Sequence, residues 1–267
     1  MHFLPKHSRL LIVAGILLVP LSQLFAGEPP LNVACMGDSI TAGAKVNSAK
    51  ESYPAQLQSI LGPAAFTVKN FGIGGATMIR RGKPTAFQEL APITAFQPDI
   101  VIVNFGINDT RSRDADYWSH FDEFPGDTRT VLTQLLDLKN RPAVILCLPT
   151  ANMADLPGMP DDRKQNVAER LPRLVEVRQK LRDLAKEFSN RNVKLVDLEA
   201  VTKDHPELYN VDGVHLNAAG YKLLAETLAP YVRSSTSQPL SQSTTAQPIQ
   251  PVVPASSGAA APAPAKP

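Results

Sequence analysis

A serine and an aspartate–histidine pair occupy positions in this chain where side chains can carry out nucleophilic chemistry. Ser39 follows residues 31–36, an apolar run that indicates a buried strand, and α/β sheets place their ligands just beyond such strand ends. A serine hydroxyl acts as a nucleophile only beside a base, a group that orients the base, and donors for an oxyanion. His215 can be the base, because Asp212, three residues earlier, can hold one imidazole nitrogen while the other faces the serine. As an isolated feature, however, Gly37-Asp38-Ser39 is equally ordinary turn chemistry before a helix.

The elements that must position these residues alternate between strand and helix. Apolar runs predict strands at 31–36, 66–71, 100–105, 143–148 and 195–197. Helical spacing, caps and breakers predict helices at 53–61, 85–96 and 128–138, a fourth helix that ends at 188, and a fifth at 218–232. Pro172 either kinks the fourth of these helices or marks its first turn. This alternation predicts an α/β domain with a parallel sheet covered on both faces.

Two further segments follow predicted strands directly. Residues 72–75 carry three glycines in four positions, which lets the backbone approach a ligand and point N–H groups at it. Their spacing does not fit a dinucleotide-binding loop, and no acidic residue stands at the required distance downstream. Gly106-Ile107-Asn108-Asp109 follows the third strand, where Asn108 alone would be explained by an Asx turn.

Taken together and in order, these segments resemble the motif blocks of the SGNH, or GDSL, hydrolases, over residues 33–228. The matching blocks are Met36-Gly37-Asp38-Ser39-Ile40-Thr41, Asn70 to Thr77, Gly106 to Asp109, and Val211 to Asn217. The resemblance implies a single flavodoxin-like three-layer domain with a parallel five-stranded sheet. It also implies a catalytic triad of Ser39, His215 and Asp212, with an oxyanion hole made by the N–H groups of Ser39 and Gly75 and the side-chain amide of Asn108. Neither a cofactor nor a metal is expected.

Within that family, residues 53–57, 70–77 and 106–110 are most similar to exported sialate or carbohydrate O-acetylesterases. We therefore expect hydrolysis of short-chain esters, acetyl above all, on a small-molecule or polysaccharide carrier. The alternatives are a lysophospholipase or thioesterase with the same triad, and a non-catalytic carbohydrate-binding domain on the same fold. The aromatic residues of the loop 111–124 would indicate a sugar carrier if they faced the site. Tyr117 and Trp118 could either stack on a sugar face or pack beneath the loop.

The remaining histidines and acids do not predict a metal site. Asp114, Asp116, His120 and Asp122 match neither a calcium loop, which needs a glycine at its sixth position, nor a zinc spacing. His205, which precedes a proline, is expected in a surface loop.

The charge of the chain indicates which partners are not expected. The net charge is +2 and no basic run interrupts the middle of the chain, so a nucleic-acid partner is not expected.

The two cysteines, Cys35 and Cys147, lie in two predicted strands that have another strand between them in the usual order of this fold. Neighbouring strands are about 4.8 Å apart, so a separation of two strands exceeds the reach of a disulfide bond. We therefore expect two buried free thiols.

The ends of the chain differ from its middle. Residues 1–26 combine basic residues, an apolar run and Ala26 before Gly27, which predicts a cleaved secretory signal and an exported protein, periplasmic or secreted. An uncleaved anchor is the alternative, and it would be the only route to membrane or cell-envelope association. Residues 234–267 are rich in Ser, Thr, Gln, Pro and Ala, which predicts a disordered tail. The hydrolase domain is therefore expected at 27–233.

Overall fold

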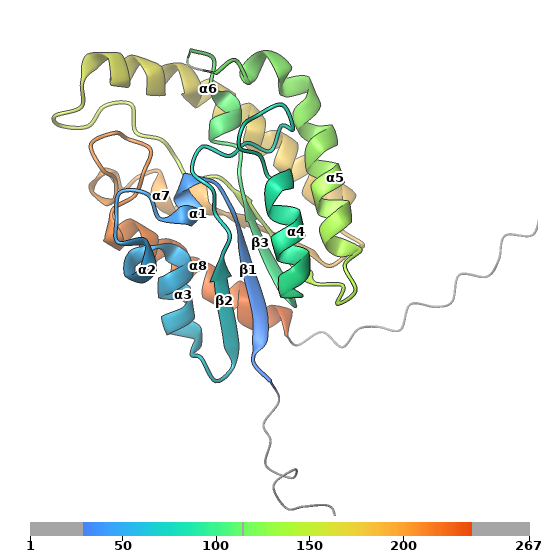
Figure 1. The fold of residues 1–267 in the computed structure, drawn as a ribbon. Helices are drawn as coiled ribbons and strands as arrows, with labels where there is room; N and C mark the ends of the chain where they lie inside the picture. Colours follow the sequence, from blue (N-terminus) through green and yellow to red (C-terminus); the bar gives the residue numbers. More distant parts are fainter. Residues whose placement is uncertain (1–28, 114, 237–267) are drawn as a thin grey trace, which may run out of the picture.

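A five-stranded parallel sheet forms the centre of the molecule, in the order β2-β1-β3-β4-β5 (Figure 1). Its strands are β1 (Leu31–Gly37), β2 (Phe66–Asn70), β3 (Ile100–Asn104), β4 (Ala143–Leu148) and β5 (Val193–Asp197). Every residue of β3 and β4 is buried, which explains why these two strands are continuous apolar runs in the sequence. The predicted α/β fold with five parallel strands is confirmed.

The structure, a computed structural model, describes residues 29–113 and 115–236. The predicted signal segment, residues 1–26, and residues 237–267 of the predicted tail lie outside these ranges. Residues 234 and 235 form the end of the last helix, α8 (Ala218–Ser235). Within the described ranges, no helix combines the length and the apolar character needed to cross a membrane.

Helices cover both faces of the sheet and produce three layers. Helices α3 (Tyr53–Leu61) and α8 pack on the face that receives Val33 and Cys35, whereas α4 (Phe87–Phe96) and α5 (Phe124–Leu136) pack on the face that receives Ala34 and Met36. This alternation follows from the two-residue period of a strand. The long helix α6 (Asp161–Glu187) contributes Val167 and Leu174 to the first core and Leu181 to the second. The short helices are α1 (Ser39–Ala42), α2 (Ser48–Glu51) and α7 (Leu198–Thr202).

Helix boundaries differ from the predictions where proline is involved. Helix α5 begins at Phe124 and not near 128, because Pro125 occupies its first turn, where a missing N–H costs nothing. Pro172 lies inside α6 and does not mark its start. The start of α3 is as expected, since the Ser52 hydroxyl accepts a hydrogen bond from the Ala55 N–H.

The two cysteines are free and buried, as predicted. Cys35 lies in β1 and Cys147 in β4, with β3 between these strands. Burial raises the pKa of both thiols well above the ordinary range. Both side chains therefore act as apolar core groups and not as nucleophiles.

The carboxyl ends of β1 and β3 mark the point at which the chain changes direction across the sheet. From β1 the chain crosses to β2 on one side, and later to β3 on the other. Gly37, the last residue of β1, is in register with Asn104, the last residue of β3. Ligands of open α/β sheets bind in the crevice at such a switch point. The segments that follow these strands, which contain Ser39 and Asn108, therefore lie where a site is expected.

Candidate active site

Ser39 is the first residue of α1, immediately beyond the end of β1. Asp38 caps this helix, with its carboxylate accepting from the Ile40 N–H at 2.9 Å. A first-turn N–H has no partner inside its own helix. Within the described residues, the Ser39 N–H makes no hydrogen bond. Both the hydroxyl and the N–H of Ser39 are therefore available to a ligand.

The structure brings Ser39, His215 and Asp212 into one hydrogen-bonded line. His215 Nε2 lies 2.8 Å from Ser39 Oγ, and His215 Nδ1 lies 2.8 Å from Asp212 Oδ2. The second carboxylate oxygen, Oδ1, accepts from the N–H groups of Val214 at 3.0 Å and His215 at 2.9 Å. Partial burial alone raises the pKa of Asp212, but these hydrogen bonds, that of the imidazole first, outweigh it and hold the pKa well below its ordinary value. Asp212 is thus ionised whenever His215 needs a counter-charge.

The turn that carries Asp212 and His215 is locked against the loop that follows β4. Gly213 has φ +69°, and a Cβ there would lie 2.0 Å from the Met153 carbonyl oxygen, so only glycine fits. The Met153 N–H donates to the Gly213 carbonyl at 2.7 Å. The position of the triad turn therefore depends on the loop at 149–153.

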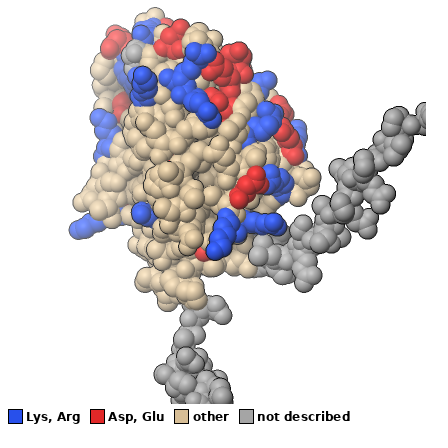
Figure 2. Space-filling model, turned by 45° about the vertical axis from the view of Figure 1, so that its right-hand side comes forward, with Lys and Arg blue, Asp and Glu red and all other residues tan. Residues whose placement is uncertain are grey.

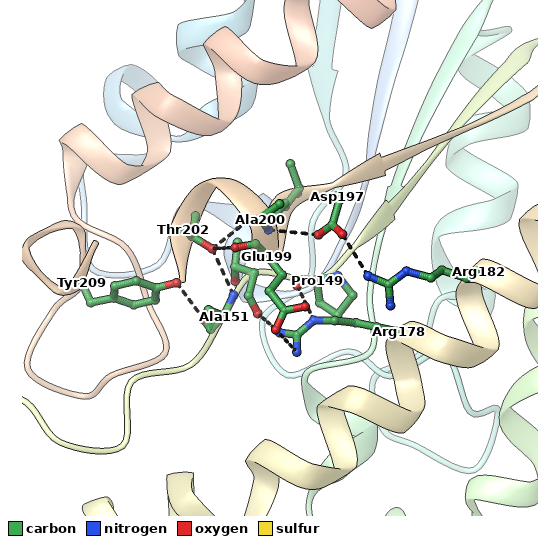
Figure 3. Close-up of polar contacts among 11 residues, drawn as sticks. Pro149, Ala151, Arg178, Arg182, Asp197, Glu199, Ala200, Thr202 and Tyr209 are labelled. Atoms are coloured by element: carbon green, nitrogen blue, oxygen red, sulfur yellow. Dashed lines mark hydrogen bonds and ion pairs between the residues drawn. The ribbon is translucent and has the colours of Figure 1, made fainter. Parts of the chain in front are cut away.

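That loop is held by a polar network around a buried arginine on α6 (Figure 3). The Arg178 guanidinium donates to the carbonyl oxygens of Pro149 at 3.1 Å and Thr150 at 2.8 Å, and it pairs with Glu199 at 2.8 Å. The Ala151 N–H donates to the Thr202 hydroxyl, and the Ala151 carbonyl accepts from the Tyr209 hydroxyl. Motif matching did not indicate Arg178, because its importance comes from where α6 passes and not from its sequence neighbours.

The glycine-rich segment after β2 presents an N–H group to the same site. A hydrogen bond from the Ala76 N–H to the Ile73 carbonyl closes a turn whose third residue, Gly75, has φ +80°. This backbone conformation is that of a type II turn, which requires glycine at this position. Within the part of the chain described here, the Gly75 N–H makes no hydrogen bond. Gly75 and Ser39 line the same cavity.

Asn108 lies beyond the end of β3 and is tied to the glycine segment. Its side-chain Nδ2 donates to the Ala76 carbonyl at 3.0 Å, which fixes the amide plane and leaves the second amide hydrogen for a ligand. The next residue, Asp109, is fully buried and accepts from the N–H groups of Met78 at 3.2 Å and Ile79 at 2.8 Å. Burial raises the pKa of Asp109 to about 7 despite these bonds. The two predicted oxyanion segments are thus one hydrogen-bonded unit.

Two buried acids lie beneath the serine, and the sequence did not single them out. Burial raises the pKa of Asp38 to about 6, although the bond to Ile40 and the nearby His215 and Arg170 lower it. Burial likewise raises the pKa of Glu89 on α4 to about 9. Glu89 Oε2 accepts from the Gly37 N–H at 3.0 Å, whereas its buried Oε1 has no partner among the described residues. Glu89 therefore fixes the strand end just before the serine, in a largely protonated form at neutral pH.

The site opens into a cavity of about 640 Å³. Its lining is mostly polar: Ser39, Ala44, Gly75, Asn108, Arg111, Arg113, Asp162, Arg163, Asn166, Arg170, Val214 and His215. Asp162, Asn166 and Arg170 recur at four-residue intervals on α6, which places them on one helix face. That spacing is visible in the sequence, but it does not say which way the face points. The wall from α6 was therefore missed.

The aromatic residues of the loop 111–124 are not part of the lining. Trp118 stacks on Phe121 with ring centroids 4.4 Å apart, and Phe121 stacks on the core residue Phe124 at 5.2 Å. Arg173 lies over the Trp118 ring, and Arg111 over Tyr117. Of the two alternatives, the structure supports packing of Trp118 beneath the loop, and Tyr117 does not line the cavity either. Arg111 and Arg113 of the same loop line the cavity instead.

The other predicted residues play no part in the cavity. His205 is exposed and lies 2.9 Å from Glu207, as expected for a surface loop. Asp116, His120 and Asp122 do not line the cavity, and Asp114 lies outside the described residues. Across residues 29–113 and 115–236, no group of three or more His, Cys, Asp or Glu side chains is arranged to hold a metal ion.

The chain is similar to known esterases in sequence and in fold. The sequence is 29% identical over 226 residues to an acetylxylan esterase from Xylanibacter ruminicola, a match that covers 77% of this chain but 44% of the relative. The chain thus spans less than half the length of that curated relative. The fold is similar to that of an aryl esterase from M. smegmatis, with a TM-score of 0.61, 19% identity, and 76% and 99% of the two chains covered. It is also similar to that of an acetylxylan esterase from Geobacillus stearothermophilus, with a TM-score of 0.57, 21% identity, and 79% and 98% covered.

The sequence model of the GDSL-like lipase/acylhydrolase family matches residues 35–223. This range begins within β1, just before the serine, and ends within α8, just after the histidine. It includes the segments that supply Ser39, Gly75, Asn108, Asp212 and His215. The chain therefore belongs to the GDSL-like lipase/acylhydrolase family.

Proposed function

We propose that this protein is a serine esterase that removes short acyl groups, acetyl above all, from carbohydrate. The observation that carries the proposal is the line of two 2.8 Å contacts from Ser39 through His215 to Asp212. Its position beside a polar cavity of about 640 Å³ leaves room for a sugar ester. Carboxylic ester hydrolysis is also the activity named for the acetylxylan esterase relative.

The proposed reaction uses two acyl-transfer steps. His215 Nε2 takes the Ser39 proton while Oγ attacks the ester carbonyl, and Asp212 stabilises the imidazolium that forms. The Ser39 and Gly75 N–H groups and the free Asn108 amide hydrogen donate to the tetrahedral oxyanion. His215 then protonates the departing sugar oxygen, which leaves an acyl-enzyme. Water attacks this intermediate with His215 again as base, and His215 then returns the proton to Ser39 Oγ as the carboxylic acid leaves.

The cavity lining supports a short acyl group. Ala44 and Val214 are the only side chains with purely apolar surface in the lining that the structure describes. Burying each CH₂ of an acyl chain is worth about 0.8 kcal/mol where an apolar wall exists. Because this lining offers little such wall, a longer chain gains little affinity. Together with the signal-like residues 1–26, the proposal is of an exported enzyme that acts on acetylated carbohydrate.

The proposal is tested by kcat/KM across p-nitrophenyl acetate, butyrate, octanoate and palmitate, together with acetate release from acetylated xylan. We expect the highest kcat/KM for acetate and release of acetate from the polysaccharide. A maximum at octanoate or longer, without release from xylan, would establish the lysophospholipase or thioesterase alternative. No hydrolysis of any ester would establish the non-catalytic alternative.

A further inference from the structure

We propose that the carrier of the scissile ester is acidic, with a carboxylate on the sugar close to the acylated position. The inference rests on the proposed esterase function and narrows its substrate class. It is carried by the arginine wall, which we define as Arg111, Arg113, Arg163 and Arg170, all in the lining of the catalytic cavity. Among the described residues, Asp162 is the one acidic side chain in that lining.

Arg163 is the member of the wall best placed to bind a carboxylate. Its Nε donates to the Asp212 carbonyl oxygen at 2.8 Å, which holds the guanidinium beside the triad. In the described ranges, its two terminal nitrogens make no hydrogen bond. The side chain is half-buried, so a carboxylate that meets those nitrogens is partly shielded from water. A planar guanidinium with two free N–H edges binds a carboxylate in bidentate fashion.

The other members of the wall supply charge in a fixed arrangement. Arg170 is 6% exposed and donates to the Thr110 hydroxyl at 2.8 Å and the Ile107 carbonyl at 2.5 Å, both neutral acceptors. Arg113 is exposed and pairs with Glu169. The described lining holds these four arginines and one acid, Asp162, and Glu169 and Asp38 lie close to members of the wall. Because Arg170 is anchored on both sides, its charge stays in place when the cavity is empty.

The basic lining is a local feature and not a reflection of a basic protein. The whole chain has a net charge of only +2. Figure 2 shows Lys and Arg mixed with Asp and Glu toward the upper end of the face, the end at which α6 lies in Figure 1. The outer surface there carries both signs, whereas the cavity lining is mainly basic. Selective attraction of an anion therefore operates inside the cavity.

A matched pair of substrates isolates this effect. The first is a methyl glucoside with one acetyl group, and the second is the methyl glucuronoside acetylated at the same oxygen. The two differ only in a carboxylate that replaces a hydroxymethyl group. We expect wild-type kcat/KM to be about 10-fold or more higher for the acidic ester, as one charge-assisted hydrogen bond provides. This ratio should fall as ionic strength rises, because salt screens the attraction.

Variants assign the preference to individual side chains. R163Q should lower the acidic-to-neutral ratio by about 10-fold, and R163K should restore part of it. Any disturbance of Asp212 in these variants acts on both substrates and cancels in the ratio. D162N should raise the ratio, because it removes the opposing charge. R129Q is the control, since Arg129 lies on α5, pairs with Glu187 and is absent from the lining, so its ratio should equal that of wild type.

A ratio near one in the wild-type enzyme, or an unchanged ratio in R163Q, would overturn the inference while leaving the esterase function intact. Binding of the two deacetylated glycosides to S39A, measured by calorimetry, separates the two claims. Tighter binding of the glucuronoside, lost in the S39A/R163Q double variant, supports the acidic carrier even if no ester is turned over. Equal binding of the two glycosides counts against it.

Discussion

The catalytic cavity has two sides that are built differently. One side, which holds Ser39, Gly75 and Asn108, consists of short segments directly beyond strand ends. The other side is the arginine wall, which comes from the start of α6 and from the loop after β3. On the first side, the strands and a few buried hydrogen bonds place the side chains. On the second side, the packing of the long helix α6 across the domain places much of the wall. The chemistry of the site is thus encoded locally, and its selectivity depends on tertiary packing.

The largest effects are expected for Ser39, on the first side of the cavity, and for His215, which contacts it. S39A and H215A should each lower kcat by about 10⁴-fold or more, because triad residues act as a unit. The double variant should be no worse than either single one. Steady-state kinetics measures the loss, and an unchanged melting temperature shows that the fold survives. Retention of more than about a tenth of the activity in S39A would assign the nucleophile elsewhere.

The next largest effect is expected at the oxyanion donor. N108A should lower kcat by about 10²-fold to 10³-fold with a smaller change in KM, because its free amide hydrogen serves charge that exists only near the transition state. The measurement is a comparison of kcat, KM and the affinity of a non-hydrolysable substrate analogue. If the affinity fell as much as kcat, Asn108 would be a ground-state binding residue.

A third effect tests the support behind the triad turn. Arg178 is 3% exposed, so R178M leaves two carbonyls and the Glu199 carboxylate without their partner. We expect about 3 kcal/mol of lost stability, or a fall of roughly 6–12 °C in Tm. Misplacement of the loop at 149–153 should also lower kcat by about 10-fold.

Arg182 provides a matched control on the same helix (Figure 3). It pairs with Asp197 at 2.9 Å, and both side chains are more than one-third exposed. R182M should therefore cost less than about 1 kcal/mol and leave kcat unchanged. Equal losses in R178M and R182M would show that the buried network does not position the triad.

A further effect is the dependence of stability on pH through Glu89. Its pKa is raised from 4.5 to about 9 in the folded state, so between these values the folded protein holds a proton that the unfolded chain has lost. Stability should therefore fall as pH rises through this window, by at most about 1.4 kcal/mol per pH unit for one proton. Asp38 and Asp109 act in the same direction, but their pKa values of about 6 and about 7 confine them to lower pH.

Between pH 7.5 and 9, above the pKa values of Asp38 and Asp109, Glu89 is still protonated in the folded protein, and the two buried thiols also hold protons that the unfolded chain loses. Urea denaturation of the wild type should show a declining free energy of unfolding across this range, and E89Q should show a shallower decline, which comes from the two thiols. An equal slope in both proteins would mean that Glu89 is ionised in the folded state at neutral pH.

The sequence predicted the first side of the cavity because its residues are fixed by their neighbours along the chain. Ser39 and Asn108 follow apolar runs, and Gly75 and Gly213 stand where the backbone needs a positive φ. The fold could be predicted for the same reason, since each strand is a local apolar run. Cys35 and Cys147 could be predicted as buried free thiols from the strand order that the family resemblance implies.

The remaining features depend on contacts between distant segments. Trp118 packs against Phe121 and not toward the cavity, and only the assembled loop decides between these two orientations. Arg163 and Arg170 line the cavity because of the way α6 packs in the domain, and a pattern of charges does not reveal which neighbour a helix faces. Glu89 and Arg178 are buried ionisable side chains, a residue type that is expected at the surface from sequence alone.

The most direct test of the account is covalent labelling of the nucleophile. The protein is treated with a fluorophosphonate, its intact mass is measured, and the modified peptide is sequenced. The account predicts one adduct per chain, on Ser39, with none in S39A and much slower labelling in H215A. The absence of an adduct on the folded wild-type protein, or an adduct on another residue that persists in S39A, would contradict it.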